Sequence, residues 1–254
     1  FHMIFEKLCI EAFDERSISK DIHEMNDHIK SLLINAPPSH EIPFEVLQDI
    51  RRKGGGLLES QPYSEKAENR LINQDNKKVT IRIFNNDTPN FVYLHIHGGG
   101  HCIGAADMQD QSLEKISNDL NCVVVSVEYR LAPANPYPAA PDDCEAAAIW
   151  LIENSKSEFN TEKIVIGGES AGANLSAVTL QRLKSKGLLG NVKGANLIYG
   201  SYDARLTPSA LRQQGSDEIF LLSYEMIRKF RDSYFQGTLD LSLPDISPIQ
   251  GDLS

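Results

Sequence analysis

The sequence around Ser170 can carry nucleophilic chemistry. Residues 168–172, GESAG, fit the pattern G-x-S-x-G; they follow a short apolar run at 163–167 and precede a helical run at 173–186. A serine at such a strand–turn–helix junction lies on a strained turn, so its hydroxyl projects from the edge of a sheet. Gly168 and Gly172 fit because a side chain at either position would crowd the turn or the adjoining strand. Ser170 is therefore the candidate nucleophile, although a plain Gly-Ser turn could have the same five letters.

A run of three glycines offers amide groups that could assist this serine. The apolar run 91–96 ends in the sequence HGGG, residues 97–100. Successive glycines let a loop turn back with its amide hydrogens exposed, and a site that stabilises an oxyanion requires such donors. A flexible glycine-rich connector is the alternative interpretation. Gly54–Gly56 give a comparison within the chain, since they follow charged residues rather than a strand and are typical of a hinge.

Together these motifs resemble those of the hormone-sensitive-lipase-like esterases of the α/β-hydrolase superfamily. The resemblance covers about residues 70–250 in the family's order, and the further matching segments are EYRLAP (128–133), PYPAA (136–140), Asp142-Asp143, Leu197-Ile198-Tyr199 with Asp203, and Ser247-Pro248. The chain departs from the family at His101, where a bulky aromatic residue is usual, at Ala173 and at Gly200. These departures concern substrate preference rather than chemistry.

The resemblance implies a carboxylic-ester hydrolase. We expect it to act on small, short-acyl esters, because a helical lid limits the depth of the pocket and the sequence shows no lipid-binding segment. Ser170 would attack the ester carbonyl, and the backbone amides of Gly99, Gly100 and Ala171 would hold the oxyanion of the tetrahedral intermediate. Water would then release the acyl group from the serine. This chemistry requires neither a metal nor an organic cofactor, and the implied partner is a small-molecule ester.

The sequence lacks the histidine that the serine of an α/β-hydrolase requires. The triad occurs in the chain order serine, acid, histidine, but all seven histidines precede Ser170. We expect His97, with Gly98, to position the glycine loop through hydrogen bonds instead, and Asp203 is only a weak candidate for the acid. The native protein is therefore expected to extend about 50–90 residues beyond Ser254, with one further acid and one histidine there. The alternative is a natural protein without a triad.

Two other functions remain compatible with the sequence. A non-catalytic small-molecule receptor or binding module on the same fold would need no histidine, but it would also need neither an exposed serine nor bare glycine amides. Amide or peptide hydrolysis is a weaker alternative that the motifs leave open. Cys102, two residues past HGGG, could be exposed to reagents but is a poor candidate nucleophile beside Ser170.

Composition and charge argue against several classes of partner. The chain of 254 residues has a formal net charge of −10, whereas phosphate binding requires a basic surface, so nucleic acid is not expected. No apolar run is long enough for a transmembrane helix, and stable membrane anchoring is not expected. Acidic residues among the first 27 positions argue against a signal peptide. We expect a cytoplasmic protein with four reduced cysteines, in which His2-Met3 is a cloning scar and a homodimer could form.

The periodicity of the chain predicts an α/β-hydrolase fold. Strands and helices alternate from residue 91 to residue 199, which is typical of a mostly parallel sheet with helices on both faces. The loops at the carboxyl ends of the strands then carry HGGG and Ser170. A hairpin between residues 68 and 84 is expected to turn at Asp75-Asn76.

The resemblance to the esterase family implies that helical segments outside this core form a lid. Residues 17–35, with Ser17 or Ser19 as N-cap, and a short segment after Pro43 have apolar faces that must pack on something distant. We expect residues 1–56 to form an N-terminal helical lid segment. Residues 57–254 would form the hydrolase core, with a lid insertion at about 204–240 that contains a helix at 223–235. The last strands of the fold are missing from this core, which would leave the strand ending at Tyr199 as an open apolar edge.

Overall fold

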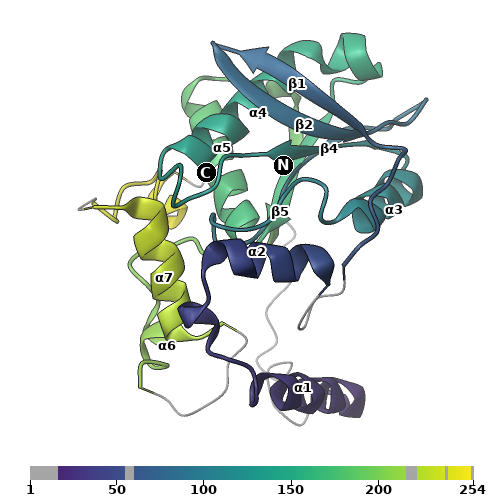
Figure 1. Cartoon of the computed structure of the whole chain (residues 1–254). Helices are drawn as coiled ribbons and strands as arrows, with labels where there is room; N and C mark the ends of the chain where they lie inside the picture. The colour runs from purple at the N-terminus through teal and green to yellow at the C-terminus, as the bar shows by residue number, and fades with distance from the viewer. Residues whose placement is uncertain (1–16, 55–59, 216–221, 238–239, 253–254) are drawn as a thin grey trace.

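Six strands of the described chain form one sheet, with helices on either side of it (Figure 1). The computed structural model describes residues 17–54, 60–215, 222–237 and 240–252; His2, Met3, Cys9, Gly55 and Gly56 lie outside these ranges. The strand order is β1-β2-β4-β3-β5-β6. The strands are β1 (Glu68–Gln74), β2 (Lys77–Phe84), β3 (Val92–Ile96), β4 (Val123–Glu128), β5 (Ile164–Glu169) and β6 (Val192–Ile198).

The sheet is mixed, and its parallel part contains both glycine motifs. β1 and β2 form the predicted hairpin, whose turn residues Asp75 and Asn76 have φ angles of 51° and 64°. Two successive residues with positive φ are what a two-residue hairpin turn of matching twist requires. β2 pairs antiparallel with β4, and the remaining pairs, β4 with β3, β3 with β5 and β5 with β6, are parallel. The predicted mostly parallel sheet is confirmed.

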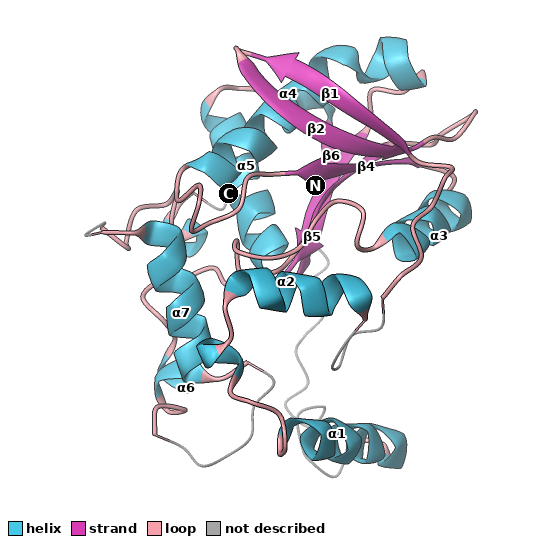
Figure 2. Cartoon of the chain, viewed as in Figure 1, coloured by secondary structure: helices cyan, strands magenta, loops and turns pink. Residues whose placement is uncertain are grey.

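Helices cover both faces of the sheet, as predicted (Figure 2). α3 (Asp110–Leu120) packs on one face, where Leu113 joins Val124 of β4 in a small apolar cluster. α4 (Ala139–Phe159) and α5 (Ala171–Ser185) pack together on the other face. There the alternate residues Val123, Val125 and Val127 belong to the main core. The period-two alternation along β4 therefore separates two cores, one on each face of the sheet.

The element boundaries differ from the predicted ones by a few residues. α5 begins at Ala171 rather than at residue 173 because the strained Ser170 is itself the N-cap. α4 continues to Phe159 and ends at Asn160, whose left-handed φ of 55° terminates the helix. β6 begins at Val192, directly after the 3₁₀ turn η4 (Leu189–Asn191). Another short helix, α6 (Pro208–Leu211), was not predicted; the Thr207 hydroxyl caps it.

The two predicted N-terminal helices behave differently. α1 (Lys20–Leu33) starts after Ser19, one of the two expected N-caps, but none of its residues is buried, and Figure 1 shows it apart from the sheet. The prediction that its apolar face packs against the rest of the chain is wrong for the described residues, in which Ile22 and Met25 are exposed. α2 (Phe44–Lys53), in contrast, packs against the core and against α7 (Tyr224–Phe235) through a stacked pair of rings, Phe44 and Phe230.

The remaining described segments are short. Two further 3₁₀ turns are η3 (Ser39–Glu41), before α2, and η5 (Pro248–Gln250), against α5. In the described ranges, no helix has both the length and the apolar character that a membrane span requires.

β6 lies at an edge of the sheet. Among the described strands it pairs only with β5, and its apolar residues Leu197 and Ile198 are 41% and 40% exposed. Tyr199, directly after it, is 77% exposed. The expected open apolar edge at this end of the sheet is confirmed for the described chain.

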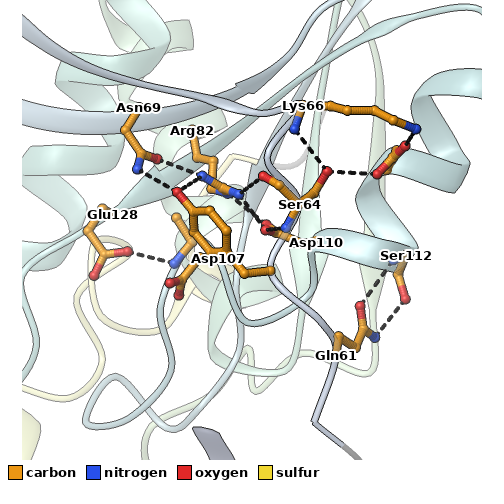
Figure 3. A network of polar contacts seen from close by, with 12 residues as sticks. Gln61, Ser64, Lys66, Asn69, Arg82, Asp107, Asp110, Ser112 and Glu128 are labelled. Atoms are coloured by element: carbon orange, nitrogen blue, oxygen red, sulfur yellow. Dashed lines mark hydrogen bonds and ion pairs between the residues drawn. The ribbon is translucent and has the colours of Figure 1, made fainter.

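A buried ion pair connects β2 to the start of α3 (Figure 3). Arg82 is 1% exposed and Asp110 is fully buried. The guanidinium Nε donates to Asp110 Oδ1 at 2.7 Å, and Nη2 donates to the other carboxylate oxygen. The remaining N–H groups of the guanidinium donate to three further acceptors: Tyr63 Oη at 3.0 Å, Asn69 Oδ1 at 3.0 Å and the Ser64 carbonyl at 2.7 Å. Because every charge and donor is satisfied, burial of this pair is tolerated.

Removal of the Asp110 carboxylate should lower the free energy of unfolding far more than removal of an exposed carboxylate on the same helix. We expect Asp110→Ala to lower the free energy of unfolding by about 3–5 kcal/mol, because it leaves the Arg82 charge buried without its counter-ion. Asp119, which pairs with Lys115 on the exposed side of α3, is the matched control, and Asp119→Ala should cost below about 0.5 kcal/mol. Urea unfolding of the complete protein measures both; equal losses would contradict this account.

Candidate active site

Ser170 occupies a strained turn between β5 and α5. Its backbone angles are φ 55° and ψ −120°, a conformation that costs a non-glycine residue of order 1–3 kcal/mol. The Ser170 amide donates to the Ile198 carbonyl of the neighbouring strand at 2.9 Å, which holds the turn in place. Its side chain is half-buried, and within the described chain the hydroxyl forms no hydrogen bond. The expected strand–turn–helix context of the serine is confirmed.

The two glycines of the GESAG motif are required by the end of β3. A Cβ atom at Gly168 or at Gly172 would overlap the Ile96 carbonyl oxygen. Neither position therefore accepts a side chain without displacing the strand that leads into HGGG. This is the crowding that the sequence predicted, and it packs the serine turn directly against β3.

The HGGG loop approaches the serine closely. A Cβ atom at Gly98 would lie 3.2 Å from the Ser170 Cβ. Gly99 and Gly100 have φ angles of 129° and 60°, so the backbone turns back immediately, and the Gly99 carbonyl accepts from the amides of Cys102 and Ile103 at 3.1 and 3.0 Å. The structure therefore brings the two glycine motifs together at one end of the sheet.

Three amides near the serine are without acceptors. Within the described residues, the N–H groups of Gly99, Gly100 and Ala171 donate no hydrogen bond, and the Ala171 N–H also belongs to the first turn of α5. Amides at a helix start are orphan donors on which the helix dipole places positive charge. The arrangement is chemically suited to an anion such as a carbonyl oxygen that gains negative charge.

His97 is a neutral ring that holds the loop. It is buried and stacks on Tyr129 at a centroid distance of 4.2 Å, and the Tyr129 hydroxyl donates to the His97 carbonyl at 2.8 Å. Burial lowers the pKa of His97 to about 3, so the imidazole is neutral at pH 7. Its Nδ1 lies 2.9 Å from the Gly98 carbonyl oxygen, and because this oxygen only accepts, Nδ1 carries the proton. The hydrogen bond expected from His97 to the loop is present.

Glu169 is a residue of the site that the sequence analysis did not single out. Oε1 accepts from the Gly98 amide and from Gln109 Nε2, both at 2.6 Å. Oε2 lies 3.1 Å from Nε2 of His95, whose Nδ1 lies 3.1 Å from the Ser126 hydroxyl. The carboxylate thus links β5 to the HGGG loop, to the segment before α3 and, through His95, to β4. No sequence signal marks this role, because position x of G-x-S-x-G accepts many residue types.

Glu169 is ionised in this environment. Burial alone would raise its pKa, but the contact with His95 and the hydrogen bonds from Gly98 and Gln109 outweigh burial and lower the pKa to about 2. Its negative charge is therefore fixed beside the serine and is satisfied by N–H donors. His95 of β3 is in contact with both Glu169 and Ser126, and so joins β5 to β4.

The other candidates do not act on the serine. His101 stacks on Tyr234 at 3.9 Å, and burial lowers its pKa to about 4. Asp203 pairs with Arg205 at 2.7 Å rather than with a histidine. Cys102 is 5% exposed and burial raises its pKa to about 12, so the expectation that reagents could reach it is wrong. No histidine of the described chain hydrogen-bonds to the Ser170 hydroxyl.

Comparison with known proteins identifies the family. A family model described as alpha/beta hydrolase fold matches residues 93–254, more than half of the chain. The chain therefore belongs to this family, and the predicted membership in its hormone-sensitive-lipase-like esterase group is confirmed by relatives that are named as ester hydrolases.

Relatives and solved structures agree with this assignment. Ethyl acetate hydrolase from Pseudomonas putida is 26% identical over 190 residues, 72% of this chain and 59% of that protein. Arylesterase from Saccharolobus solfataricus is 36% identical over 138 residues, 52% of this chain and 45% of that protein. A hyperthermophilic esterase from Pyrobaculum calidifontis matches with a TM-score of 0.78 and 25% identity, over 93% of this chain and 76% of that one. The chain spans less than two thirds of the length of these two sequence relatives.

The ionised Glu169 should make a pH-dependent contribution to stability. Its pKa of about 2 lies below the ordinary value of 4.5, so the ionised form stabilises the fold above about pH 4.5, and this stabilisation is lost as pH falls toward 2. Glu169→Gln should therefore be less stable than wild type at pH 7, and the difference should shrink by about 1 kcal/mol between pH 7 and pH 3.5.

Urea unfolding at several pH values measures this difference. The matched control is Glu153→Gln, at an exposed position of α4 where the described chain shows no hydrogen bond or ion pair. A difference between wild type and Glu169→Gln that does not change with pH would contradict the assignment of a lowered pKa.

Proposed function

We propose that the complete protein hydrolyses carboxylic esters with Ser170 as its nucleophile. One observation carries the proposal: the serine lies on a strained turn beside a glycine loop, and three nearby amides donate to no group in the part of the chain that the structure describes. A strained nucleophile position next to unused donors has no evident use in a purely structural turn. The names of the relatives, which include ethyl acetate hydrolase and arylesterase, support the same reaction class.

In the proposed reaction, the Ser170 hydroxyl oxygen forms a bond to the ester carbonyl carbon and loses its proton to a histidine. The amides of Gly99, Gly100 and Ala171 hold the resulting oxyanion, and each donor is worth about 3 kcal/mol of barrier reduction. The carbon–oxygen bond to the alcohol then breaks, the alcohol takes the proton, and water releases the acyl group in a second addition. We propose that the histidine and its acid lie outside these 254 residues, since no histidine of the described ranges hydrogen-bonds to the serine.

A non-catalytic receptor on the same fold is the less favoured function. Such a receptor would bind its ligand without a strained serine turn, and the named relatives are hydrolases. A small-molecule ester is the proposed partner, whereas the homodimer and the cytoplasmic location remain predictions.

Removal of the serine hydroxyl tests the nucleophile. In the complete protein, Ser170→Ala should lower kcat/KM for p-nitrophenyl acetate by at least about 10³-fold, because the covalent step is lost. A serine-directed phosphonate should add once to wild type and not to Ser170→Ala, as intact mass measures. Ser157→Ala, on the exposed surface of α4, is the control and should leave both results unchanged. Labelling that survives Ser170→Ala would refute the proposal.

The aromatic side chain beside the loop predicts a small acyl site. A Cβ atom at Gly100 would overlap the Phe230 ring of α7, so this ring lies directly against a proposed oxyanion donor. Phe230 is backed by Phe44 of α2, with 5.6 Å between the ring centroids. We therefore expect acetyl and butyryl esters to be hydrolysed faster than long-chain triglycerides.

Shortening the aromatic side chain should shift this preference. Phe230→Ala should raise the ratio of octanoyl to acetyl ester turnover about 3–10-fold, because about one to two extra methylenes can then be buried. Arg228→Ala, on the exposed side of the same helix, is the control. An unchanged ratio, or a wild-type preference for long-chain triglycerides, would show that Phe230 does not limit the site.

A further inference from the structure

One face of α2 lies against the HGGG loop. Phe44, Gln48 and Arg51 are spaced four and three residues apart, which places them on the same side of the helix. Gln48 hydrogen-bonds to Gly104, Arg51 hydrogen-bonds to Gly98, and Phe44 stacks on the Phe230 ring that packs on the loop. Val46 and Ile50, on the other side of α2, are exposed. The face of α2 that meets the loop is therefore polar at Gln48 and Arg51, while Phe44 packs against the core and the Phe230 ring.

Gln48 forms two hydrogen bonds with the backbone of Gly104, at the far end of the loop that begins with HGGG. The Gly104 amide donates to Gln48 Oε1 at 2.6 Å, and Gln48 Nε2 donates to the Gly104 carbonyl at 2.9 Å. This pair satisfies both polar groups of one residue with a single side chain. It fixes the distance between α2 and the loop, so that the next turn of the helix is held over Gly98 and Gly99.

Arg51 reaches the peptide group between Gly98 and Gly99. Its Nη1 donates to the Gly98 carbonyl oxygen at 3.4 Å, and a Cβ atom at Gly99 would lie 3.0 Å from the same nitrogen. The Gly98 oxygen also accepts from His97 Nδ1 at 2.9 Å. At 3.4 Å the hydrogen bond is long, so the charge of the guanidinium carries much of the interaction.

The orientation of this carbonyl determines the orientation of a proposed oxyanion donor. A peptide group is planar and trans, so the N–H of Gly99 points opposite to the C=O of Gly98. Two donors on that oxygen hold the plane in one orientation. They also polarise the peptide, because an acceptor that receives hydrogen bonds makes the N–H of the same group a stronger donor.

We propose that Arg51 is a positioning residue for the oxyanion hole, acting from an outer helix through the Gly98–Gly99 peptide. The proposal rests on the proposed ester hydrolysis for its catalytic consequence. Arg51 holds and polarises this peptide together with His97, and Gln48 sets the height of α2 above the loop. Two contacts hold α7 against this end of α2. Phe44 stacks on Phe230, and Lys229 donates a hydrogen bond to the Ile42 carbonyl just before α2. Displacement of α2 would therefore loosen the oxyanion hole.

Kinetics of the complete protein test the consequence. Arg51→Met keeps the length of the side chain and removes its charge and its donors; we expect kcat to fall about 10-fold with KM within about twofold. Inhibition by a short-chain trifluoromethyl ketone, which forms a tetrahedral adduct with serine, should weaken about 10-fold as well. Arg51→Lys should recover most of both losses, because it restores the charge near the carbonyl.

Arg52→Met is the matched control. Arg52 is the next residue of the same helix and pairs with Asp107 at 3.0 Å, and its side chain is 52% exposed. This variant should leave kcat, KM and inhibition unchanged, and thermal unfolding of all variants identifies any loss of folding. A loss in Arg52→Met equal to that in Arg51→Met would overturn the proposal, as would a loss confined to KM.

A measurement that requires no activity separates this inference from the proposed function. Selective labelling of glycine carbonyl carbon and amide nitrogen restricts a nuclear magnetic resonance spectrum to Gly-Gly pairs, among them Gly98–Gly99. The Gly99 amide proton should shift upfield in Arg51→Met, since its peptide is less polarised, and should not move in Arg52→Met. An unmoved Gly99 resonance would refute the inference. If the Gly99 resonance moves in Arg51→Met but the wild-type protein hydrolyses no ester, the proposed function is refuted and the inference about Arg51 is not.

Discussion

The parallel pairing of β3 with β5 is the constraint on which the site depends. Ile96 is paired with Gly168 and His95 with Gly167, so both strands end at the same level and in the same direction. HGGG directly follows β3, and GESAG spans the end of β5 and the turn after it, so the two motifs must meet. The contact is so close that only glycine is tolerated at Gly168 and Gly172, against the Ile96 carbonyl. Backbone packing at this edge, rather than any side-chain contact, places the strained serine beside the amide-rich loop.

Polar side chains then hold the loop from several directions. The Gly98 amide is bound by the carboxylate of Glu169, and the Gly98 carbonyl by His97 and Arg51. One residue of the loop is thus fixed on both sides by groups from β5, from His97 directly after β3, and from α2. A loop with three glycines has high conformational entropy, and such contacts are what allow it to keep its amides in one orientation. Because His97 is neutral and Glu169 is ionised, the charges around the loop are constant near pH 7.

The support for the loop extends into the rest of the fold. Gln109 donates a hydrogen bond to the Glu169 carboxylate. The next residue, Asp110, is bound to β2 by the buried ion pair with Arg82. The start of α3 is therefore fixed at two adjacent residues, one toward the core and one toward the site. On the outer side, α2 and α7 enclose the loop through polar and aromatic contacts. α1 takes no part in this enclosure, because its apolar residues lie exposed rather than against the core.

The sequence by itself determined the fold class and the two motifs of the candidate site. Alternating apolar runs identified the strands, and glycines at the strand ends marked where backbones had to come close, because both signals are local. It could not show that Glu169, Gln48 and Arg51 converge on one loop, since their distances along the chain from Gly98 bear no relation to their distances in space. The apolar face of α1 and the position of Cys102 were misjudged for the same reason. Periodicity shows which side of an element is apolar, but only tertiary packing decides what lies against that side.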